Sequence, residues 1–373
     1  MSDVIVVGLG ADGSAAAAHL ARRGARVVGL EAFSRGHTNG SSGGLTRVIR
    51  LAYYEHPDYV PLLRRAWALW RELEVATGRE LLRQTGGVYV GPRDGDLVDG
   101  SLRSAREHGL EHELLDPATL RARFPLFRFD PEWWGLAEAS AGYLLPEHCI
   151  EAHLSVAEGH GAQLRFDERV ASWSVEGSGV RVTTDRGAYH ADRIVIAAGA
   201  WNARLLPQIA PDLVVKRVPL FWFEPVAEKD ALAKLPVYIV DSGHGHGCYG
   251  FPYLPDQGLK IATHGMGTPT DPDSVDREVH ASDEAAVREF IRLRFPAADG
   301  PTRQAKICMY TVTPDEHFIV DVAGPVAYAS ACSGHGFKFA SVMGEILADL
   351  ALDGRTRHPI GFLSASRFTA ARA

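Results

Sequence analysis

The first 31 residues contain the pattern that most limits the possible folds of this chain. A β-branched run at 3–7 leads directly into the glycine-rich sequence GLGADG at 8–13, and an alanine-rich helical stretch follows at 14–23. A second β-branched run at 26–30 ends in the acidic residue Glu31. A strand, a GxGxxG turn, a helix and a second strand with a terminal acid form the local context of a dinucleotide-binding βαβ unit.

Each residue of this pattern has a physical role. Gly8 allows the tight turn, Gly10 lets the backbone approach a pyrophosphate, and Gly13 lets the helix lie close to the sheet. The helix N-terminus offers free N–H groups to phosphate, and Glu31 can accept hydrogen bonds from ribose hydroxyls. Asp12 is unfavourable beside a phosphate unless it points away or caps the helix. The pattern predicts dinucleotide binding, does not choose between FAD and NAD, and leaves a plain βαβ unit as the alternative.

Composition and charge exclude several other classes of protein. The chain has 373 residues, 46% hydrophobic and 23% charged, which is far from the composition of disordered or fibrous proteins. Its 39 Lys and Arg against 46 Asp and Glu give a formal charge of −7, opposite in sign to that of most nucleic-acid binders. No apolar run approaches the roughly 20 residues that cross a bilayer. No basic segment precedes an apolar signal core, so we expect a cytoplasmic protein without membrane or nucleic-acid partners.

The cysteines argue against a metal site. Cys149, Cys248, Cys308 and Cys332 show no CxxC spacing and are few for this length. We therefore expect neither a zinc site nor a disulfide framework, which fits a reducing compartment.

The rest of the chain alternates between helical and β-rich stretches. Helical periodicity predicts helices at 59–77, 97–108, 285–295 and 342–352. A meander of strands is expected at 168–174, 180–184 and 189–198, and the apolar run at 193–201 suits the middle of a parallel sheet. Short β-like runs also dominate 221–263.

These elements predict a mixed α/β protein with a Rossmann-like nucleotide-binding domain assembled from discontinuous segments. A β-rich substrate domain is inserted twice, with the ligand in the cleft between the two. We expect the nucleotide-binding domain at 1–81, 148–214 and 313–373, and the substrate domain at 82–147 and 215–312.

Several longer motifs are more specific than the glycine-rich turn. They are GSSGGLTRVIR at 40–50 with Ala52 and Tyr53, GAWN at 199–202, GLKIATH at 258–264, CMYTVTPDEHF at 308–318 and SGHGFKF at 333–339. Together they resemble the monomeric sarcosine oxidase family, which includes N-methyltryptophan and pipecolate oxidases. The resemblance covers essentially the whole chain in the family's order.

The resemblance implies an FAD amine oxidase that acts on a small secondary amino acid, with sarcosine as the leading substrate. Such an enzyme forms an imine that water hydrolyses, reduces O2 to H2O2, and is a monomer. Proline, pipecolate or an N-methyl aromatic amino acid are alternative substrates. A flavin dehydrogenase with another electron acceptor, and a non-catalytic flavin- or NAD-binding module, are alternative functions.

The resemblance also assigns roles to basic side chains. Arg50 and Lys338 match the pair that holds the substrate carboxylate, a task suited to a guanidinium and an ammonium group. Lys260 matches the lysine associated with oxygen reduction, since a fixed cation stabilises the negative charge that develops on O2.

Cys308 matches the residue that carries FAD through a thioether to its 8α carbon. The nearby Arg47 is a candidate for lowering the pKa of this thiol. His264, Tyr249 and Tyr310 match residues that contact the substrate or line its pocket. Glu55 is expected to support these residues without contacting the substrate itself.

The expected cofactor contacts follow from the same match. They are Gly8, Gly10, Ala11, Asp12, Gly13, Glu31, Ala32, Ser41, Ser42, Thr46, Arg47, Val170, Ala198, Gly199, Trp201, Cys308, Met309, Gly334, His335, Gly336, Phe337 and Lys338. Ser42 and Gly43 stand where sarcosine oxidases tend to carry a His-His pair, one member of which aids flavin attachment. Leu51 and Tyr54 also differ from residues common in sarcosine oxidases and predict an altered pocket.

Overall fold

The structure is a computed structural model that describes residues 2–209, 212–241, 247–265, 267–330 and 333–370. Cys332 lies outside the described residues, whereas Cys149, Cys248 and Cys308 are buried free thiols. Within the described residues, no group of three or more His, Cys, Asp or Glu side chains is placed to hold a metal ion. Across the same part of the chain, no helix combines the length and apolar character that crossing a bilayer requires.

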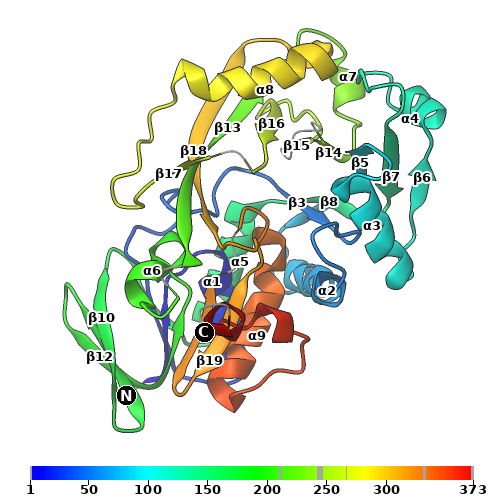
Figure 1. Cartoon of the computed structure of the whole chain (residues 1–373). Coiled ribbons are helices and arrows are strands. Elements are labelled where there is room, and N and C mark those ends of the chain that lie inside the picture. Colours follow the sequence, from blue (N-terminus) through cyan, green and yellow to red (C-terminus); the bar gives the residue numbers. More distant parts are fainter. Residues whose placement is uncertain (1, 210–211, 242–246, 266, 331–332, 371–373) are drawn as a thin grey trace.

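Eight strands of the described chain form the first sheet, which has a parallel centre (Figure 1). Strand β1 (Ser2–Val7) lies between β2 (Val27–Leu30) and β12 (Ala188–Ile196), and both pairings are parallel. Strands β9 (Gln163–Arg165) and β20 (Val326–Ser330) continue the parallel order on β2 and β12. The antiparallel additions are β10 (Val170–Glu176), β11 (Gly179–Thr184) and β19 (Ile319–Ala323).

Helix packing against this sheet depends on small residues. Helix α1 (Ala11–Arg22) contacts both α5 (Pro146–Gly159) and α9 (Ala340–Asp353). A Cβ at Gly344 of α9 would lie 2.4 Å from the Cβ of Ala15, so the two helices approach as closely as a glycine allows. The alanine-rich sequence of α1 therefore serves close packing beside the glycine-rich turn.

The second sheet contains nine strands among the described residues. Its order is β17 (Thr268–Pro269), β13 (Val214–Phe223), β16 (Leu259–Thr263), β15 (Gly247–Gly250), β14 (Val237–Asp241), β5 (Gly87–Gly91), β7 (Trp134–Glu138) and β6 (Glu113–Leu115), with β18 (Thr302–Val312) paired to β13. Helix α8 (Ala281–Arg294) packs against β13 and β16, and α3 (Asp96–Glu107) packs against β5 and β7. In Figure 1, α8 lies along the top of this sheet.

A small sheet of β3 (Arg47–Arg50), β4 (Leu82–Gln84) and β8 (Ala141–Leu144) lies between the two larger ones in Figure 1. Helix α2 (Tyr59–Thr77) follows β3, and its buried face includes Trp70, which donates to the Lys338 carbonyl at 3.0 Å. Strand β3 therefore carries the arginine-bearing motif between the two large sheets.

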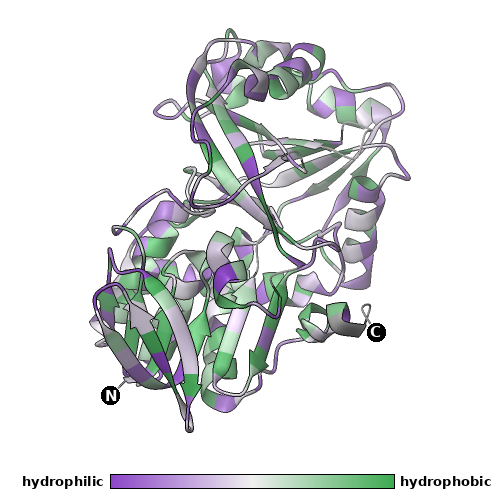
Figure 2. Ribbon diagram, turned by 60° about the vertical axis from the view of Figure 1, so that its left-hand side comes forward, coloured by the Kyte–Doolittle hydropathy of each residue, from purple (hydrophilic) through white to green (hydrophobic). Residues whose placement is uncertain are grey.

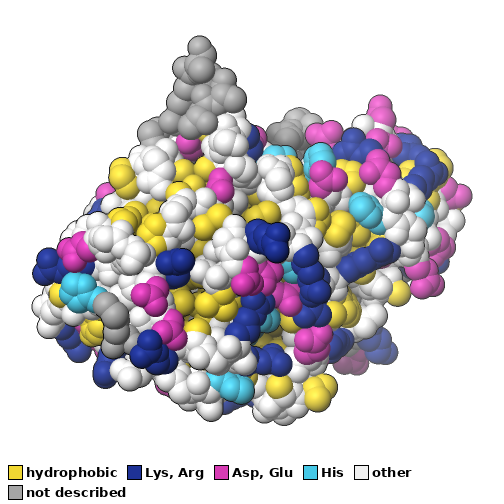
Figure 3. Space-filling model, turned by 90° about the horizontal axis from the view of Figure 1, so that it is seen from below, with side chains coloured by type: hydrophobic (Ala, Val, Ile, Leu, Met, Phe, Trp, Pro, Cys, Tyr) yellow, Lys and Arg dark blue, Asp and Glu magenta, His cyan; other side chains and the backbone are white. Residues whose placement is uncertain are grey.

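The distribution of polar and apolar residues agrees with this layering. Figure 2 shows hydrophobic residues concentrated in the strands and in the helices that cover the first sheet. Figure 3 views the molecule from below, and on that face basic and acidic side chains are intermingled. Pairs such as Arg35 with Glu151 and Glu158 illustrate the same mixing.

The predicted mixed α/β fold class is confirmed, and the parallel sheet and the β-rich sheet both occur. The helix expected at 59–77 coincides with α2, which ends at Thr77 and is followed by the C-cap Gly78 with a φ of 66°. The predicted strand at 193–201 was too long, because β12 ends at Ile196 and Gly199–Trp201 forms a 3-10 turn. Helix α8 begins before the predicted residue 285, since His280 and Asp283 form a capping box. The division into domains at the residues given above stays a prediction.

Candidate active site

A cavity of about 380 Å³ opens where the parallel strands of the first sheet end. Thirteen of the expected cofactor contacts line it: Gly8, Gly10, Ala11, Asp12, Glu31, Ala32, Ser41, Ser42, Val170, Ala198, Gly199, Trp201 and Phe337. The carboxyl ends of β1, β2 and β12 meet here, at the edge where open α/β sheets bind their ligands.

The three glycines of the turn satisfy the steric demands expected of them. Gly8 has a φ of 86°, and a Cβ there would lie 2.5 Å from the Ala197 carbonyl oxygen. A Cβ at Gly13 would lie 1.8 Å from the Gly8 carbonyl oxygen. At Gly10 the nearest atom would be Ser42 Oγ at 3.6 Å, so the backbone stays open toward the cavity.

The polar groups of the cavity fit a dinucleotide. Glu31 is buried, and its carboxylate accepts from the N–H groups of Leu9 at 2.8 Å and Phe33 at 3.2 Å, which fixes the acid at the cavity wall. The hydroxyls of Ser41 and Thr46 are buried without a hydrogen-bond partner among the described residues. The Ser41 hydroxyl belongs to the cavity lining, where a polar group of a bound dinucleotide can satisfy it.

Asp12 occupies the first turn of α1 and lines the same cavity. Burial raises the pKa of its carboxyl to about 7. The acid lies in the first turn of α1, close to the N–H groups that the helix N-terminus leaves free.

Cys308 lies in β18 beyond this cavity, opposite Val218 of β13. Its sulfur is 3.5 Å from the Ser41 carbonyl oxygen and 3.7 Å from Nη2 of Arg47. Arg47 also donates to the carbonyls of Thr46 at 2.9 Å and Ser41 at 3.2 Å. The thiol thus adjoins both the cavity-lining loop and a half-buried cation.

Lys260 is a buried strand residue whose ammonium is held by backbone oxygens. Its Nζ donates to the carbonyls of Gly44 at 2.7 Å and Thr46 at 2.8 Å, and the Trp222 and Phe251 rings flank it at 5.1 and 4.9 Å. Burial, and next the charge of Arg47, lowers the pKa of Lys260 well below its ordinary value. The Lys260 side chain is buried, so it is not an ordinary strand lysine on a solvent-exposed face.

Arg50 is buried at the end of β3 and contacts Glu55 directly. Its Nη2 lies 2.7 Å from both carboxylate oxygens of Glu55, and its Nη1 donates to the Ala52 carbonyl at 3.1 Å. The guanidinium carbon lies 4.2 Å from the centre of the Tyr53 ring and 4.7 Å from that of Tyr54. The sequence predicted that Glu55 supports the site residues without contacting the substrate. In the structure it binds Arg50 directly.

Lys338, near the C-terminal end of the sequence, also contacts Tyr53. It lies in η4 (Phe337–Phe339), with Nζ 5.1 Å from the centre of the Tyr53 ring and 3.5 Å from the Tyr53 hydroxyl. Nζ also donates to the His335 carbonyl at 2.6 Å. Burial, together with the charge of Arg50, lowers the pKa of Lys338 to about 7.

His335 is fixed in one tautomer by its two partners. Its Nε2 donates to the Glu316 carbonyl at 3.0 Å, so Nδ1 is the nitrogen that accepts from the Tyr53 hydroxyl. Burial lowers the pKa of His335 to about 3, which keeps the ring neutral. A hydrogen-bonded chain therefore runs from Lys338 through Tyr53 and His335 to Glu316.

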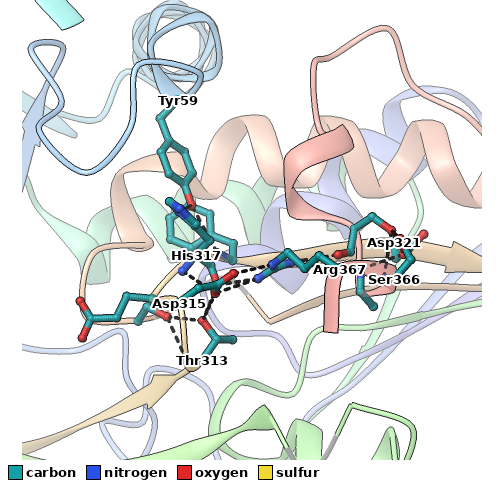
Figure 4. A network of polar contacts seen from close by, with 12 residues as sticks. Tyr59, Thr313, Asp315, His317, Asp321, Ser366 and Arg367 are labelled. Atoms are coloured by element: carbon teal, nitrogen blue, oxygen red, sulfur yellow. Dashed lines mark hydrogen bonds and ion pairs between the residues drawn. The ribbon is translucent and has the colours of Figure 1, made fainter. Parts of the chain in front are cut away.

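The turn that carries Glu316 is itself tied down by a polar network (Figure 4). Arg367 donates to Asp315 at 2.7 Å and to the His317 carbonyl at 3.2 Å, and Thr313 donates to the same carbonyl at 2.6 Å. Tyr59 of α2 contacts His317 Nδ1 at 3.2 Å. Helix α10 (Ser366–Ala370), which carries Arg367, and helix α2 thus both support the turn that holds His335.

Two tyrosines and a histidine lie on the Cys308 side of the site. A hydrogen bond joins the hydroxyls of Tyr249 and Tyr310, and the His264 ring lies 6.4 and 6.1 Å from their ring centres. A Cβ at Gly334 would lie 2.5 Å from the Tyr310 ring, so this position requires glycine. The structure brings these three residues together.

Met309, one of the expected cofactor contacts, lies on the opposite face of β18 from Cys308. Cys308 packs with Leu220 and Trp222, whereas Met309 on the opposite face of β18 packs with Ala200 and Val215. Two further expected contacts are glycines outside the cavity lining. Gly336 immediately precedes η4, and Gly13 serves helix packing.

Comparisons with known proteins give the family of this chain. The family model described as FAD dependent oxidoreductase matches residues 3–350. The chain is 43% identical to the monomeric sarcosine oxidase of Streptomyces avermitilis over 100% of this chain and 99% of that protein. It is 34% identical to the N-methyl-L-tryptophan oxidase of Salmonella dublin over 98% and 99% of the two chains. The solved open form of the Tyr258Phe mutant of NikD, described as an unusual amino acid oxidase essential for nikkomycin biosynthesis, superposes with a TM-score of 0.85 at 25% identity, covering 97% and 96%.

The family model settles the choice of dinucleotide that the glycine-rich turn left open, in favour of FAD. The match spans the cavity, the arginine-bearing strand and the cysteine-bearing strand alike. This chain belongs to the family of FAD-dependent oxidoreductases that includes monomeric sarcosine oxidase and N-methyl-L-tryptophan oxidase.

Proposed function

We propose that this protein oxidises a small secondary amino acid, with sarcosine as the leading substrate, to an imine that water hydrolyses. FAD, held by the residues that line the cavity, would supply the hydride acceptor and the route of the electrons to O2, which gives H2O2. The observation that carries the proposal is the convergence of Arg50 and Lys338 on the Tyr53 ring, at 4.2 and 5.1 Å. Two buried cations from distant segments, in a chain of this family, fit a substrate with one carboxylate.

The Arg50 guanidinium already holds a carboxylate, that of Glu55. In our proposal the substrate carboxylate takes the place of Glu55 on Arg50, and Lys338 adds a second positive charge. The buried cations also disfavour a third positive charge nearby, so the substrate ammonium loses its proton on binding. The neutral amine that results is the form that can give up a hydride.

Lys260 is the residue that we assign to oxygen. Its amine is fixed by the Gly44 and Thr46 carbonyls and shielded by Trp222 and Phe251, and negative charge that develops on O2 would favour the protonated form against its lowered pKa. A positive charge fixed in a buried site stabilises negative charge that develops nearby without any reorganisation of the protein.

Cys308 is the residue that we assign to covalent attachment of FAD, through a thioether to the 8α carbon. Its sulfur lies 3.7 Å from Nη2 of Arg47 and 3.5 Å from the carbonyl oxygen of Ser41, a residue that lines the cavity. Attachment would proceed here without the His-His pair, since Ser42 and Gly43 occupy those positions.

Tyr249, Tyr310 and His264 line the substrate pocket in this proposal. We further infer that the protein acts as a monomer in the cytoplasm, which light scattering of the purified protein and fractionation of its host cells would test.

The test is to screen purified protein for H2O2 release with sarcosine, proline, pipecolate and N-methyl aromatic amino acids. We expect the highest kcat/KM with sarcosine. A preference for one of the others would keep the chemistry and change the substrate. Bleaching of the flavin near roughly 450 nm without peroxide formation in air would indicate a dehydrogenase, and no bleaching by any of them would refute the proposal.

A further inference from the structure

Glu138 is a buried acid to which neither sequence nor resemblance assigned a role. It ends β7, and its side chain reaches the bend that follows β3. Its carboxylate accepts from the N–H of Leu51 at 3.1 Å, from the N–H of Ala52 at 3.0 Å, and from the Tyr89 hydroxyl. Three donors from two segments therefore meet on one side chain.

The bend held by Glu138 is the one that encloses Arg50. The Arg50 guanidinium lies against the Tyr53, Tyr54 and Tyr89 rings, at 4.2, 4.7 and 5.6 Å from their centres. We call these three rings the tyrosine cage. Glu138 binds one member of the cage, Tyr89, through its hydroxyl, and anchors the backbone just before the other two.

Ala52 links the acid to the arginine. Its N–H donates to Glu138, while its carbonyl accepts from Arg50 Nη1 at 3.1 Å. In the described part of the chain, no backbone carbonyl accepts from the N–H groups of Leu51 or Ala52. Removal of Glu138 would therefore leave two N–H groups without partners, at a bend where such groups cost free energy.

We propose that Glu138 is a positioning residue that holds the tyrosine cage around Arg50, so that the guanidinium keeps its place while the substrate carboxylate replaces Glu55. The inference rests on the proposed role of Arg50 as the carboxylate-binding residue. Glu138 acts through hydrogen bonds to Leu51, Ala52 and Tyr89, and touches neither substrate nor cofactor in this proposal. Burial raises the pKa of Glu138 to about 7, opposed by the hydrogen bonds from Tyr89 and Ala52.

Three variants separate this role from others. Glu138→Ala removes all three hydrogen bonds. Glu138→Gln keeps an oxygen for the two N–H groups and an NH2 group that can donate to the Tyr89 hydroxyl, but it has no charge. Tyr89→Phe removes a single hydrogen bond. The matched control is Glu113→Ala, an exposed acid of the adjacent strand β6 that pairs with Arg123.

The experiment titrates each holoenzyme with methoxyacetate, the analogue of sarcosine in which an ether oxygen replaces the amine, and follows the absorbance of the bound flavin. Steady-state kcat and KM for sarcosine are measured alongside. We expect Glu138→Ala to raise both the Kd of methoxyacetate and KM about tenfold or more, with a smaller change in kcat. Glu138→Gln should stay within about threefold of wild type, Tyr89→Phe should lie between, and Glu113→Ala should not change.

An unchanged Kd in Glu138→Ala would overturn the inference, as would a Glu138→Gln variant that is as impaired as Glu138→Ala. If Glu138→Ala does not fold, Tyr89→Phe decides: a raised Kd with kcat retained supports positioning, and a wild-type Kd refutes it. Arg50→Met separates the two proposals. If that variant binds methoxyacetate as wild type does, Arg50 is not the docking group; if it loses binding while Glu138→Ala keeps it, only the role of Glu138 fails.

Discussion

Both carboxylate oxygens of Glu55 lie 2.7 Å from Nη2 of Arg50, so an acid of the chain occupies the guanidinium that we assign to the substrate. Burial raises the pKa of Glu55, but the attraction and hydrogen bonding of Arg50, together with the neighbouring basic groups, outweigh burial and lower this pKa to about 2. Glu55 is therefore ionised throughout the neutral range. A substrate carboxylate has to compete with it.

The Glu55→Gln variant tests this competition. It removes the internal anion while keeping the size of the side chain, so the affinity for methoxyacetate should rise about fivefold. Breaking a buried ion pair costs about 3–5 kcal/mol, so the variant should also unfold at a lower temperature than wild type. A folded variant with unchanged or weaker binding would contradict the assignment of Arg50.

Lys338 predicts a pH dependence of substrate binding. Its pKa of about 7 means that the second cation is present below that pH and absent above it. The affinity for methoxyacetate should therefore fall as the pH rises through about 7 in wild type, while Lys338→Met should bind more weakly at every pH below 7.

The comparison of these two pH profiles is necessary because Glu138 and Asp12 also have a pKa near 7. Both acids are retained in Lys338→Met. The part of the pH dependence that disappears in this variant belongs to Lys338, and an unaltered profile would show that another group titrates.

Lys260→Met should separate the two halves of the reaction. Anaerobic reduction by sarcosine depends on substrate docking and should change little, whereas reoxidation by O2 loses its fixed cation and should slow at least a hundredfold. Stopped-flow absorbance measures the two rates independently. Lys234→Met, at an exposed lysine, is the control, and equal losses in both halves would refute the assigned role.

The sequence predicted the parts of this structure that depend on local order. The turn at Gly8, Gly10 and Gly13 and helix α2 follow from residue type and spacing over a few turns, and the structure confirms them. The start of α8 was missed because His280 is an uncommon N-terminal cap.

The site could be predicted only through the resemblance. No local pattern shows that Arg50 of β3 and Lys338 of η4 meet at one ring, because that contact depends on the packing of distant segments. Glu138 carried no signal at all: an acid at the end of a strand is usually exposed, and its donors come from separate segments.

Covalent attachment of FAD predicts a simple difference between variants. Wild-type protein precipitated in acid should stay yellow, and the peptide that contains Cys308 should carry the added mass of the flavin. Cys308→Ser should release its flavin into the supernatant, while Cys248→Ser, at another buried thiol, should retain it. Release from wild type would show that the bond does not form.

Asp12 makes the affinity for FAD itself dependent on pH, a property best measured in the Cys308→Ser background, where FAD binds without a covalent bond. Because burial raises the pKa of Asp12 to about 7, its carboxyl is neutral below that pH and anionic above it. The anion lines the cavity at the helix N-terminus that binds the pyrophosphate in this fold, so it should repel the cofactor. The Kd for FAD should therefore increase as the pH rises through 7, and Asp12→Asn should remove this increase.

Fluorescence quenching of FAD measures the Kd directly, and Asp94→Asn serves as a control. A Kd that is independent of pH in the parent protein would contradict this prediction. A Kd that worsens in Asp12→Asn would mean that the carboxyl favours binding of the cofactor.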